Sequence, residues 1–235
     1  MNERLSVWTR QHATLMAMGV LAFMLERSSL PLLAIAGGSI LGLLIRFRGS
    51  YTPNKGFGAG NILTLIRVTL ALVLMAKNDL SLALTAAAIM IALLSDGLDG
   101  WIAKRSGMAS PFGDVFDQES DALLFLSICL LLIEDRQVGL WILLPASYRY
   151  LFILFCRSIK PTEKAIQGTW VTRAIGITSV MALAICLAPI VTDQGVYWTA
   201  SAVTLLLSLS FLKSGFLLYR PSPTGGSDAQ KDISN

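Results

Sequence analysis

The stretch "SDGLDGWIAKR", residues 95–105, follows an apolar run and ends in two basic residues. It places Asp96 and Asp99 at the end of the hydrophobic residues 80–94, where a carboxylate is costly. Just downstream, "GDVFDQESD", residues 113–121, adds three more aspartates. So much negative charge beside apolar segments needs a compensating partner. The nature of the group that compensates these carboxylates is therefore the main question about the function of this chain.

The rest of the chain is mostly apolar. Of its 235 residues, 54% are hydrophobic and 14% are charged, whereas an average soluble domain is about 25% charged. We therefore predict an all-α, polytopic membrane bundle of about eight transmembrane helices, because each crossing needs about 20 mostly apolar residues. The apolar runs are 14–25, 30–45, 62–76, 80–94, 122–133, 138–155, 175–191 and 196–218. The first is the weakest and could instead lie at the membrane interface.

The basic residues lie mostly in alternate loops. If the N-terminus is cytoplasmic and all these runs span, the opposite side holds only Arg27, Lys77 and Arg136. This asymmetry is what the positive-inside rule describes. We therefore expect an integral, multi-pass protein of the cell (inner) membrane, with its site on the cytoplasmic side. The net charge of +4 is an orientation signal and does not indicate nucleic-acid binding.

The chain divides into three parts. Residues 1–60 are predicted to form an N-terminal helical hairpin and a cytoplasmic linker, residues 61–220 a six-helix core, and residues 221–235 a disordered polar tail. No internal repeat is evident, which counts against many transporter folds. His12 is the only histidine, and one histidine cannot build a metal site, so no role is assigned to it.

The spacing of the aspartates places them in two pairs. Asp96 and Asp99 are three residues apart, and Asp117 and Asp121 are four apart, so each pair shares a helix face. The intervening loop, expected over residues 104–113, can fold the two helix ends together. Four converging carboxylates suit Mg²⁺ or Mn²⁺, and two such ions form a clamp for phosphoryl transfer.

The neighbouring residues fit a phosphorylated ligand. Gly97 and Gly100 leave the helix surface bare beside the acids, so that a nucleotide could approach the backbone. Gly113 opens a similar gap before the second pair. Lys104 and Arg105 can contact phosphate oxygens. Glu119 falls on a different face of its helix, outside this pattern.

A known family carries the same pattern. The stretch reads Asp96-x2-Asp99-Gly100-x2-Ala103-Lys104-x8-Gly113-x3-Asp117-x3-Asp121. Over these 26 residues it closely resembles the signature of the CDP-alcohol phosphotransferase (phosphatidyltransferase) family, with Lys104 where the family has Arg. "NILTLIR", residues 61–67, also resembles the first core helix of family members such as phosphatidylglycerophosphate synthase, with Asn61, Thr64 and Arg67 in matching places. The likeness covers residues 61 to about 219.

The resemblance implies a reaction and a set of roles. Family members displace CMP from a CDP-linked alcohol, usually CDP-diacylglycerol, with the hydroxyl of a second alcohol. The resemblance implies two metal ions, Mg²⁺ or Mn²⁺, with Asp96, Asp99, Asp117 and Asp121 as their ligands. Asp121 would also be the general base. The CMP and diphosphate site would be lined by Gly100, Lys104, Gly113 and Thr64. A homodimer in the bilayer is implied as well.

The acceptor alcohol is less defined. Ala122 follows Asp121, where many family members that make phosphatidylglycerophosphate carry Lys, which counts against glycerol-3-phosphate. Arg149 and Arg157 are candidates for binding an anionic acceptor. Arg149 lies inside an apolar run, which is costly. Snorkelling, or pairing with a carboxylate, would account for it equally well.

Two other functions compete with this interpretation. The aspartates could line the ion path of a divalent-cation transporter, although such carboxylates are expected nearer the membrane midplane. The chain could also be a non-catalytic relative that binds a lipid. Metal uptake into vesicles without CMP release would support the transporter, and nucleotide binding without turnover would support the non-catalytic relative.

Overall fold

A computed structural model describes residues 2–76, 81–105, 110–158 and 170–219. Within them, the side chains of residues 2, 82, 96–105, 156–158, 170–173, 214 and 216–219 lie outside the description. All regular elements in these parts are helices. They are α1 (Asn2–Glu26), α2 (Leu30–Arg46), α3 (Ala59–Ala76), α4 (Leu82–Arg105), α5 (Pro111–Asp135), η1 (Leu140–Ile142), α6 (Leu143–Ser158), α8 (Trp170–Cys186) and α9 (Asp193–Tyr219). The all-α fold class is thereby confirmed.

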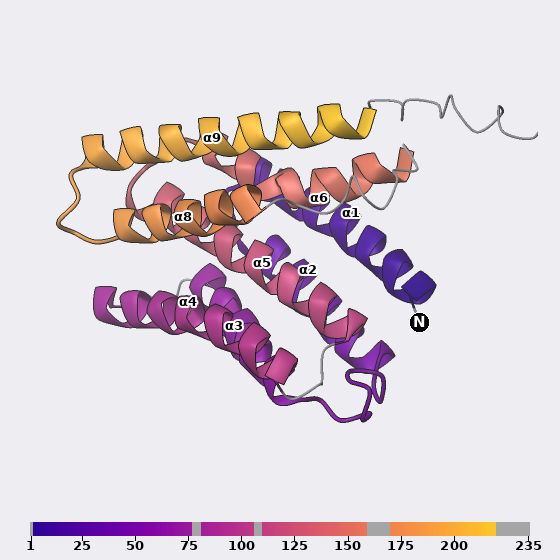
Figure 1. The fold of residues 1–235 in the computed structure, drawn as a ribbon. Coiled ribbons are helices and arrows are strands. Elements are labelled where there is room, and N and C mark those ends of the chain that lie inside the picture. The colour runs from indigo at the N-terminus through magenta and orange to yellow at the C-terminus, as the bar shows by residue number, and fades with distance from the viewer. Residues whose placement is uncertain (1, 77–80, 106–109, 159–169, 220–235) are drawn as a thin grey trace, which may run out of the picture.

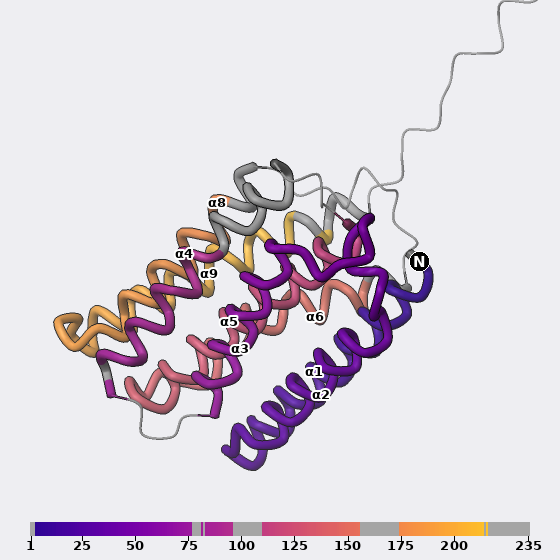
Figure 2. Tube along the Cα trace, turned by 90° about the horizontal axis from the view of Figure 1, so that it is seen from below, coloured from indigo at the N-terminus to yellow at the C-terminus, as the bar shows by residue number. Residues whose placement is uncertain are grey.

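The helices lie side by side and form a bundle (Figure 1). The hairpin of α1 and α2 lies on one flank of the bundle and packs against α6 and α3, whereas α8 and α9 lie on the opposite flank (Figure 2). Helix α5 is central, because it contacts α1, α3, α6 and α8. The C-terminal end of α4 and the N-terminal end of α5 lie at the same end of the bundle (Figure 1).

Burial explains why α5 takes the central place. Its residues 123–132 are apolar on nearly every side, and all but Phe125 are buried. A helix that is apolar all round is stable only when other helices or lipid surround it. Its first turns are different, because they carry Asp114, Asp117 and Asp121 at the end of the bundle. The buried half therefore anchors a polar end.

Helix lengths agree only partly with the predicted spans. The described part of each apolar run lies within a helix or a helix with its adjoining turn. Among the described residues, only Ala59–Ala76 and Asp193–Lys213 are long and apolar enough to cross a membrane by length and composition. Four shorter apolar helices accompany them in the described part of the chain. The number of membrane crossings therefore stays a prediction.

The prediction of a loop over residues 104–113 is wrong at both ends. Helix α4 continues to Arg105, and α5 already begins at Pro111. The cause is local: proline suits the first turn of a helix, and the Oγ of Ser110 accepts a hydrogen bond from the backbone N–H of Gly113 at 3.0 Å. The same hydroxyl donates to the carbonyl of Tyr51, in the linker between α2 and α3. One serine thus starts α5 and fixes the linker to it.

We predict that Ser110→Ala lowers the free energy of unfolding by about 1–2 kcal/mol, because α5 loses its N-terminal cap and its bond to the linker. Thermal unfolding of the detergent-solubilised protein measures the loss. Ser81→Ala is the control, because the Ser81 hydroxyl accepts from the Leu84 N–H at an exposed helix start and makes no comparable bond to another segment. Equal losses in the two variants would contradict the role of the Tyr51 contact.

Candidate active site

Asp117 and Asp121 converge on one buried cation. The Nη1 of Arg67 donates to Oδ1 of Asp117 at 2.8 Å and to Oδ1 of Asp121 at 2.6 Å. Arg67 itself is fully buried, whereas the side chains of the two aspartates are 38% and 50% exposed. The guanidinium thus lies beneath two carboxylates that remain partly exposed.

Three helices build this arrangement. Arg67 comes from α3, the aspartates come from α5, and the Nε of Arg67 donates to the carbonyl of Ala92 in α4 at 3.4 Å. A buried guanidinium is stable only when its donors are satisfied and its charge is compensated. Asp117 and Asp121 supply that compensation. The ion pairs therefore fix both carboxylates relative to α3 and α4.

The same face of α3 carries two further polar residues. Asn61 and Thr64 are buried, and their side chains donate to the carbonyls of Phe57 and Gly60 one turn earlier, at 2.6 and 3.2 Å. A Cβ at Gly113 would lie 3.1 Å from Oδ1 of Asn61. Glycine at this position therefore lets the start of α5 approach α3 closely.

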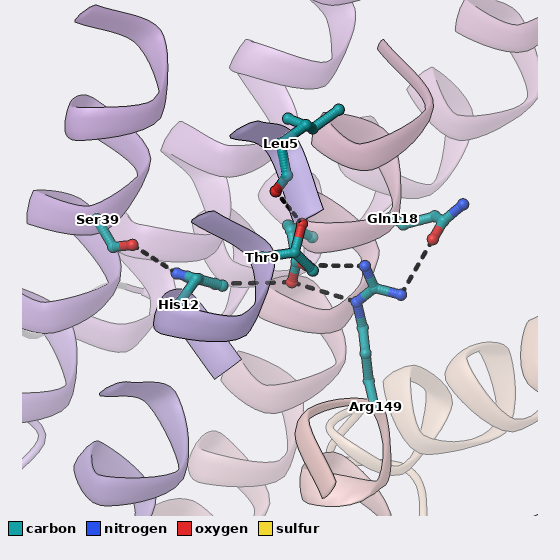
Figure 3. Close-up of polar contacts among 7 residues, drawn as sticks. Leu5, Thr9, His12, Ser39, Gln118 and Arg149 are labelled. Carbon is teal, nitrogen blue, oxygen red and sulfur yellow. Dashed lines mark hydrogen bonds and ion pairs between the residues drawn. The ribbon is translucent and has the colours of Figure 1, made fainter. Parts of the chain in front are cut away.

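A second buried ion pair lies on the other side of α5. Glu119 is fully buried, and Arg149 of α6 contacts both of its oxygens: Nη2 lies 2.7 Å from Oε1, and Nε lies 3.2 Å from Oε2. The Nη1 of Arg149 donates to Oε1 of the exposed Gln118 at 3.2 Å (Figure 3). Pairing with a carboxylate thus accounts for the arginine in an apolar run. Glu119 does lie on a different helix face from Asp117 and Asp121, as predicted.

His12 joins this pair from the N-terminal hairpin. Its Nε2 lies 3.6 Å from Oε2 of Glu119, and its Nδ1 lies 2.7 Å from the hydroxyl of Ser39 in α2 (Figure 3). The ring is fully buried, stacks on Trp8 at 4.8 Å and meets the edge of Tyr150 at 6.0 Å. Sequence reasoning assigned no role to His12. An arginine in an apolar run and a glutamate outside the aspartate pattern are a signal for the Arg149–Glu119 pair, but no sequence pattern signals the approach of His12 to Glu119.

Comparison with known proteins identifies the family. The family model described as CDP-alcohol phosphatidyltransferase matches residues 58–209, which is more than half of the chain. The chain belongs to the CDP-alcohol phosphatidyltransferase family. It is also similar to a CDP-diacylglycerol–glycerol-3-phosphate 3-phosphatidyltransferase of Treponema pallidum (strain Nichols), at 32% identity over 74 residues. That match covers 32% of this chain and 34% of the relative, so the two are aligned over only about a third of their lengths. No solved structure matches the chain.

The match places the described geometry within the family region. Arg67, Asp117, Asp121 and Arg149 all lie inside residues 58–209 of the CDP-alcohol phosphatidyltransferase match, whereas α1 and α2 lie outside it. Asp117 and Asp121 lie on one face of α5, as their spacing predicts, and both pair with Arg67, which their spacing does not predict. Thr64 lies one turn from Arg67 on α3, and Gly113 lies at the start of α5.

The other predicted site residues fall where side chains are not described. The backbone of α4 is helical through Asp96, Asp99, Gly100 and Lys104, but their side chains lie outside the described residues, as does that of Arg157. Their roles stay predictions. The neighbouring Ala92, one helical turn before Asp96, does contact Arg67.

CDP-alcohol phosphatidyltransferases generally depend on a divalent metal. Among the residues with described side chains, no three His, Cys, Asp or Glu groups gather as a metal site. The part that is described fits the donor chemistry, because Asp117 and Asp121 present half-exposed carboxylates to one point, and Mg²⁺ and Mn²⁺ prefer such hard oxygen ligands. Asp96 and Asp99 would have to complete the set.

We predict that Arg67→Met lowers the free energy of unfolding by about 3 kcal/mol, because it leaves two neighbouring carboxylates without their buried counter-charge. Thermal or chemical unfolding in detergent measures the loss. Arg10→Met is the matched control: Arg10 is exposed and donates to Ser6 one turn earlier on its own helix, so its removal should cost well under about 1 kcal/mol. A loss for Arg67→Met no larger than that of the control would show that Arg67 does not organise the site.

Proposed function

We propose that this chain transfers the phosphatidyl group of a CDP-linked alcohol, such as CDP-diacylglycerol, to the hydroxyl of an acceptor alcohol and releases CMP, as a step of phospholipid biosynthesis. The observation that carries the proposal is the pair of partly exposed carboxylates, Asp117 and Asp121, held on Arg67 within the family match. The relative named a CDP-diacylglycerol–glycerol-3-phosphate 3-phosphatidyltransferase supports the same class of reaction.

The proposed reaction is a single displacement at phosphorus. The acceptor oxygen forms a bond to the phosphorus that bears the alcohol, and the bond from this phosphorus to the bridging oxygen breaks. The electron pair leaves with CMP. Asp121 takes the proton of the acceptor hydroxyl, because a half-exposed carboxylate can reach a bound hydroxyl within hydrogen-bond distance.

The remaining residues would hold the reactants. Asp96, Asp99, Asp117 and Asp121 would bind two Mg²⁺ or Mn²⁺ ions, which neutralise negative charge on the diphosphate. Gly100, Lys104, Gly113 and Thr64 would line the CMP and diphosphate site. Arg67 keeps Asp117 and Asp121 in place and limits their mutual repulsion.

A groove between α4 and α8 suits a lipid-linked donor. It has a volume of about 450 Å³ and is lined by apolar side chains that include Ile89, Leu93 and Met181. Leu93 lies three residues before Asp96 on the helix that carries the first half of the signature. An acyl chain in this groove would leave the diphosphate near the aspartates. The proposal therefore favours a diacylglycerol-linked donor.

An anionic acceptor would use Arg149, with Arg157 as a second candidate. The side chain of Arg149 is 26% exposed, and Gln118, to which it donates, lies three residues before Asp121 on α5. Such an acceptor could carry a phosphate, as glycerol-3-phosphate does for the Treponema relative, or a carboxylate. We further propose that the helices span the cell membrane with the site on the cytoplasmic side, and that the chain acts as a homodimer.

Transport of divalent cations is the second candidate. Family membership and the fixed pairing of Asp117 and Asp121 with one buried arginine favour the enzyme. Uptake of Mn²⁺ into sealed vesicles that contain the protein, without CMP release, would instead support transport.

We predict that Asp121→Asn reduces CMP release by about 10³-fold, because the amide cannot take the acceptor proton. The assay follows CMP from CDP-diacylglycerol with Mg²⁺ or Mn²⁺ and a panel of acceptors: glycerol-3-phosphate, serine, inositol, inositol phosphate and a lipid alcohol. Asp114→Asn is the matched control, because Asp114 is an exposed aspartate in the first turn of the same helix and lies outside the signature. If Asp121→Asn released CMP at an undiminished rate, Asp121 would be excluded as the general base.

We predict that Ala184→Phe, which fills the groove between α4 and α8, raises the KM for long-chain CDP-diacylglycerol about tenfold, a loss of roughly 1.4 kcal/mol of binding. The KM for a short-chain analogue should stay unchanged, because its acyl chains do not reach the groove. Ala34→Phe, at an exposed position on α2, is the control. Equal effects on long-chain and short-chain donors would exclude the groove as an acyl site.

A further inference from the structure

In the described part of the chain, His12 of the N-terminal hairpin turns its buried Nε2 toward Glu119 of the family core, at 3.6 Å and without a hydrogen-bond partner. Helices α1 and α2 lie outside the matched residues 58–209, yet His12 of α1 reaches Glu119 of α5, and Glu119 holds Arg149 of α6. Packing α1 on apolar surface alone would not require a histidine there. A buried polar ring is costly unless its contacts are used.

Glu119 sets the direction of the Arg149 guanidinium. It engages Nε and Nη2, which form one edge of the planar group, and so leaves Nη1 pointing to Gln118. The buried carboxylate and the guanidinium form a dipole whose positive end faces the exposed Gln118. An anion that displaced the neutral amide of Gln118 would make a stronger, charge-assisted hydrogen bond to Nη1.

His12 in turn restrains Glu119. Terminal carboxylate torsions have broad preferences, so a glutamate keeps one orientation only when both oxygens are confined. Arg149 binds both oxygens from one side, and the His12 ring packs against Oε2 from the α1 side at 3.6 Å, so that the carboxylate has little room to turn. The ring cannot turn away freely, because Ser39 contacts its Nδ1 (Figure 3) and Trp8 stacks on its face.

We infer that the N-terminal hairpin completes the acceptor site: His12 and Glu119 are positioning residues that orient Arg149 toward the anionic group of the acceptor alcohol. The inference rests on the proposed phosphatidyl transfer, and it extends the site to a helix that the family match does not cover. Arg149 is the group that would touch the acceptor. His12 and Glu119 act through it.

Substitutions of His12 can separate its two contacts. Asparagine places its amide near the position of Nδ1, so His12→Asn keeps the partner of Ser39 but removes the group that faces Glu119. Glutamine places its amide near Nε2, so His12→Gln keeps the group that faces Glu119. Phe23→Ala is the control for hairpin packing, because Phe23 is a buried residue near the other end of α1.

The first measurement is steady-state kinetics with saturating CDP-diacylglycerol and either glycerol-3-phosphate or uncharged glycerol as acceptor. We expect His12→Asn to raise the KM for glycerol-3-phosphate about tenfold, and Glu119→Gln about 100-fold, with kcat changed less than about threefold. His12→Gln and Phe23→Ala should stay within about threefold of the unmodified protein, and the KM for glycerol should not respond in any variant. A rise for Phe23→Ala equal to that for His12→Asn would reduce His12 to a packing residue and overturn the inference.

The second measurement needs no turnover. Isothermal titration of glycerol-3-phosphate and inorganic phosphate into the purified full chain should show weaker binding for Arg149→Gln, Glu119→Gln and His12→Asn, and near-normal binding for His12→Gln. If the variants show this ranking of anion affinities but the protein releases no CMP, the anion site is supported and the proposed transfer is refuted. If the protein releases CMP but the variants do not show this ranking of anion affinities, or if neither anion binds, the inference is overturned.

Discussion

The structure depends on one interaction, the buried guanidinium of Arg67 shared by Asp117 and Asp121. A cation in the interior of a helical bundle is tolerated only with compensating charge, and two carboxylates on one face of α5 supply it. Because Arg67 belongs to α3 and also contacts α4 through Ala92, the interaction fixes the three helices that carry the family signature. The catalytic end of the bundle is therefore held by the same charges that the proposed chemistry uses.

A second buried pair repeats this principle on the far side of α5. Glu119 compensates Arg149, and His12 brings the N-terminal hairpin into the same polar cluster. Helix α5 thus lies between two cations, with Arg67 facing the signature aspartates and Arg149 facing the hairpin. In the proposed reaction, a helix that is otherwise apolar and buried would support both the donor side and the acceptor side of the site.

Sequence alone could predict much of this. Apolar runs predicted the helices, and the spacing of the aspartates predicted that Asp117 and Asp121 would share a face. The pairing of Arg67 with these aspartates and of His12 with Glu119 could not be predicted, because they depend on which helices become neighbours. The loop between α4 and α5 was predicted too long, because Ser110 and Pro111 start α5 before its apolar part begins.

The central claim is that the site transfers a phosphatidyl group. Its most direct test uses CDP-diacylglycerol labelled with ³²P at the phosphorus next to diacylglycerol, incubated with the purified protein, a divalent metal and the acceptor panel. The account predicts that the label moves into a new lipid with one acceptor, while the released CMP carries none. Label that stays in CDP-diacylglycerol with every acceptor, or that leaves with the nucleotide, would contradict it.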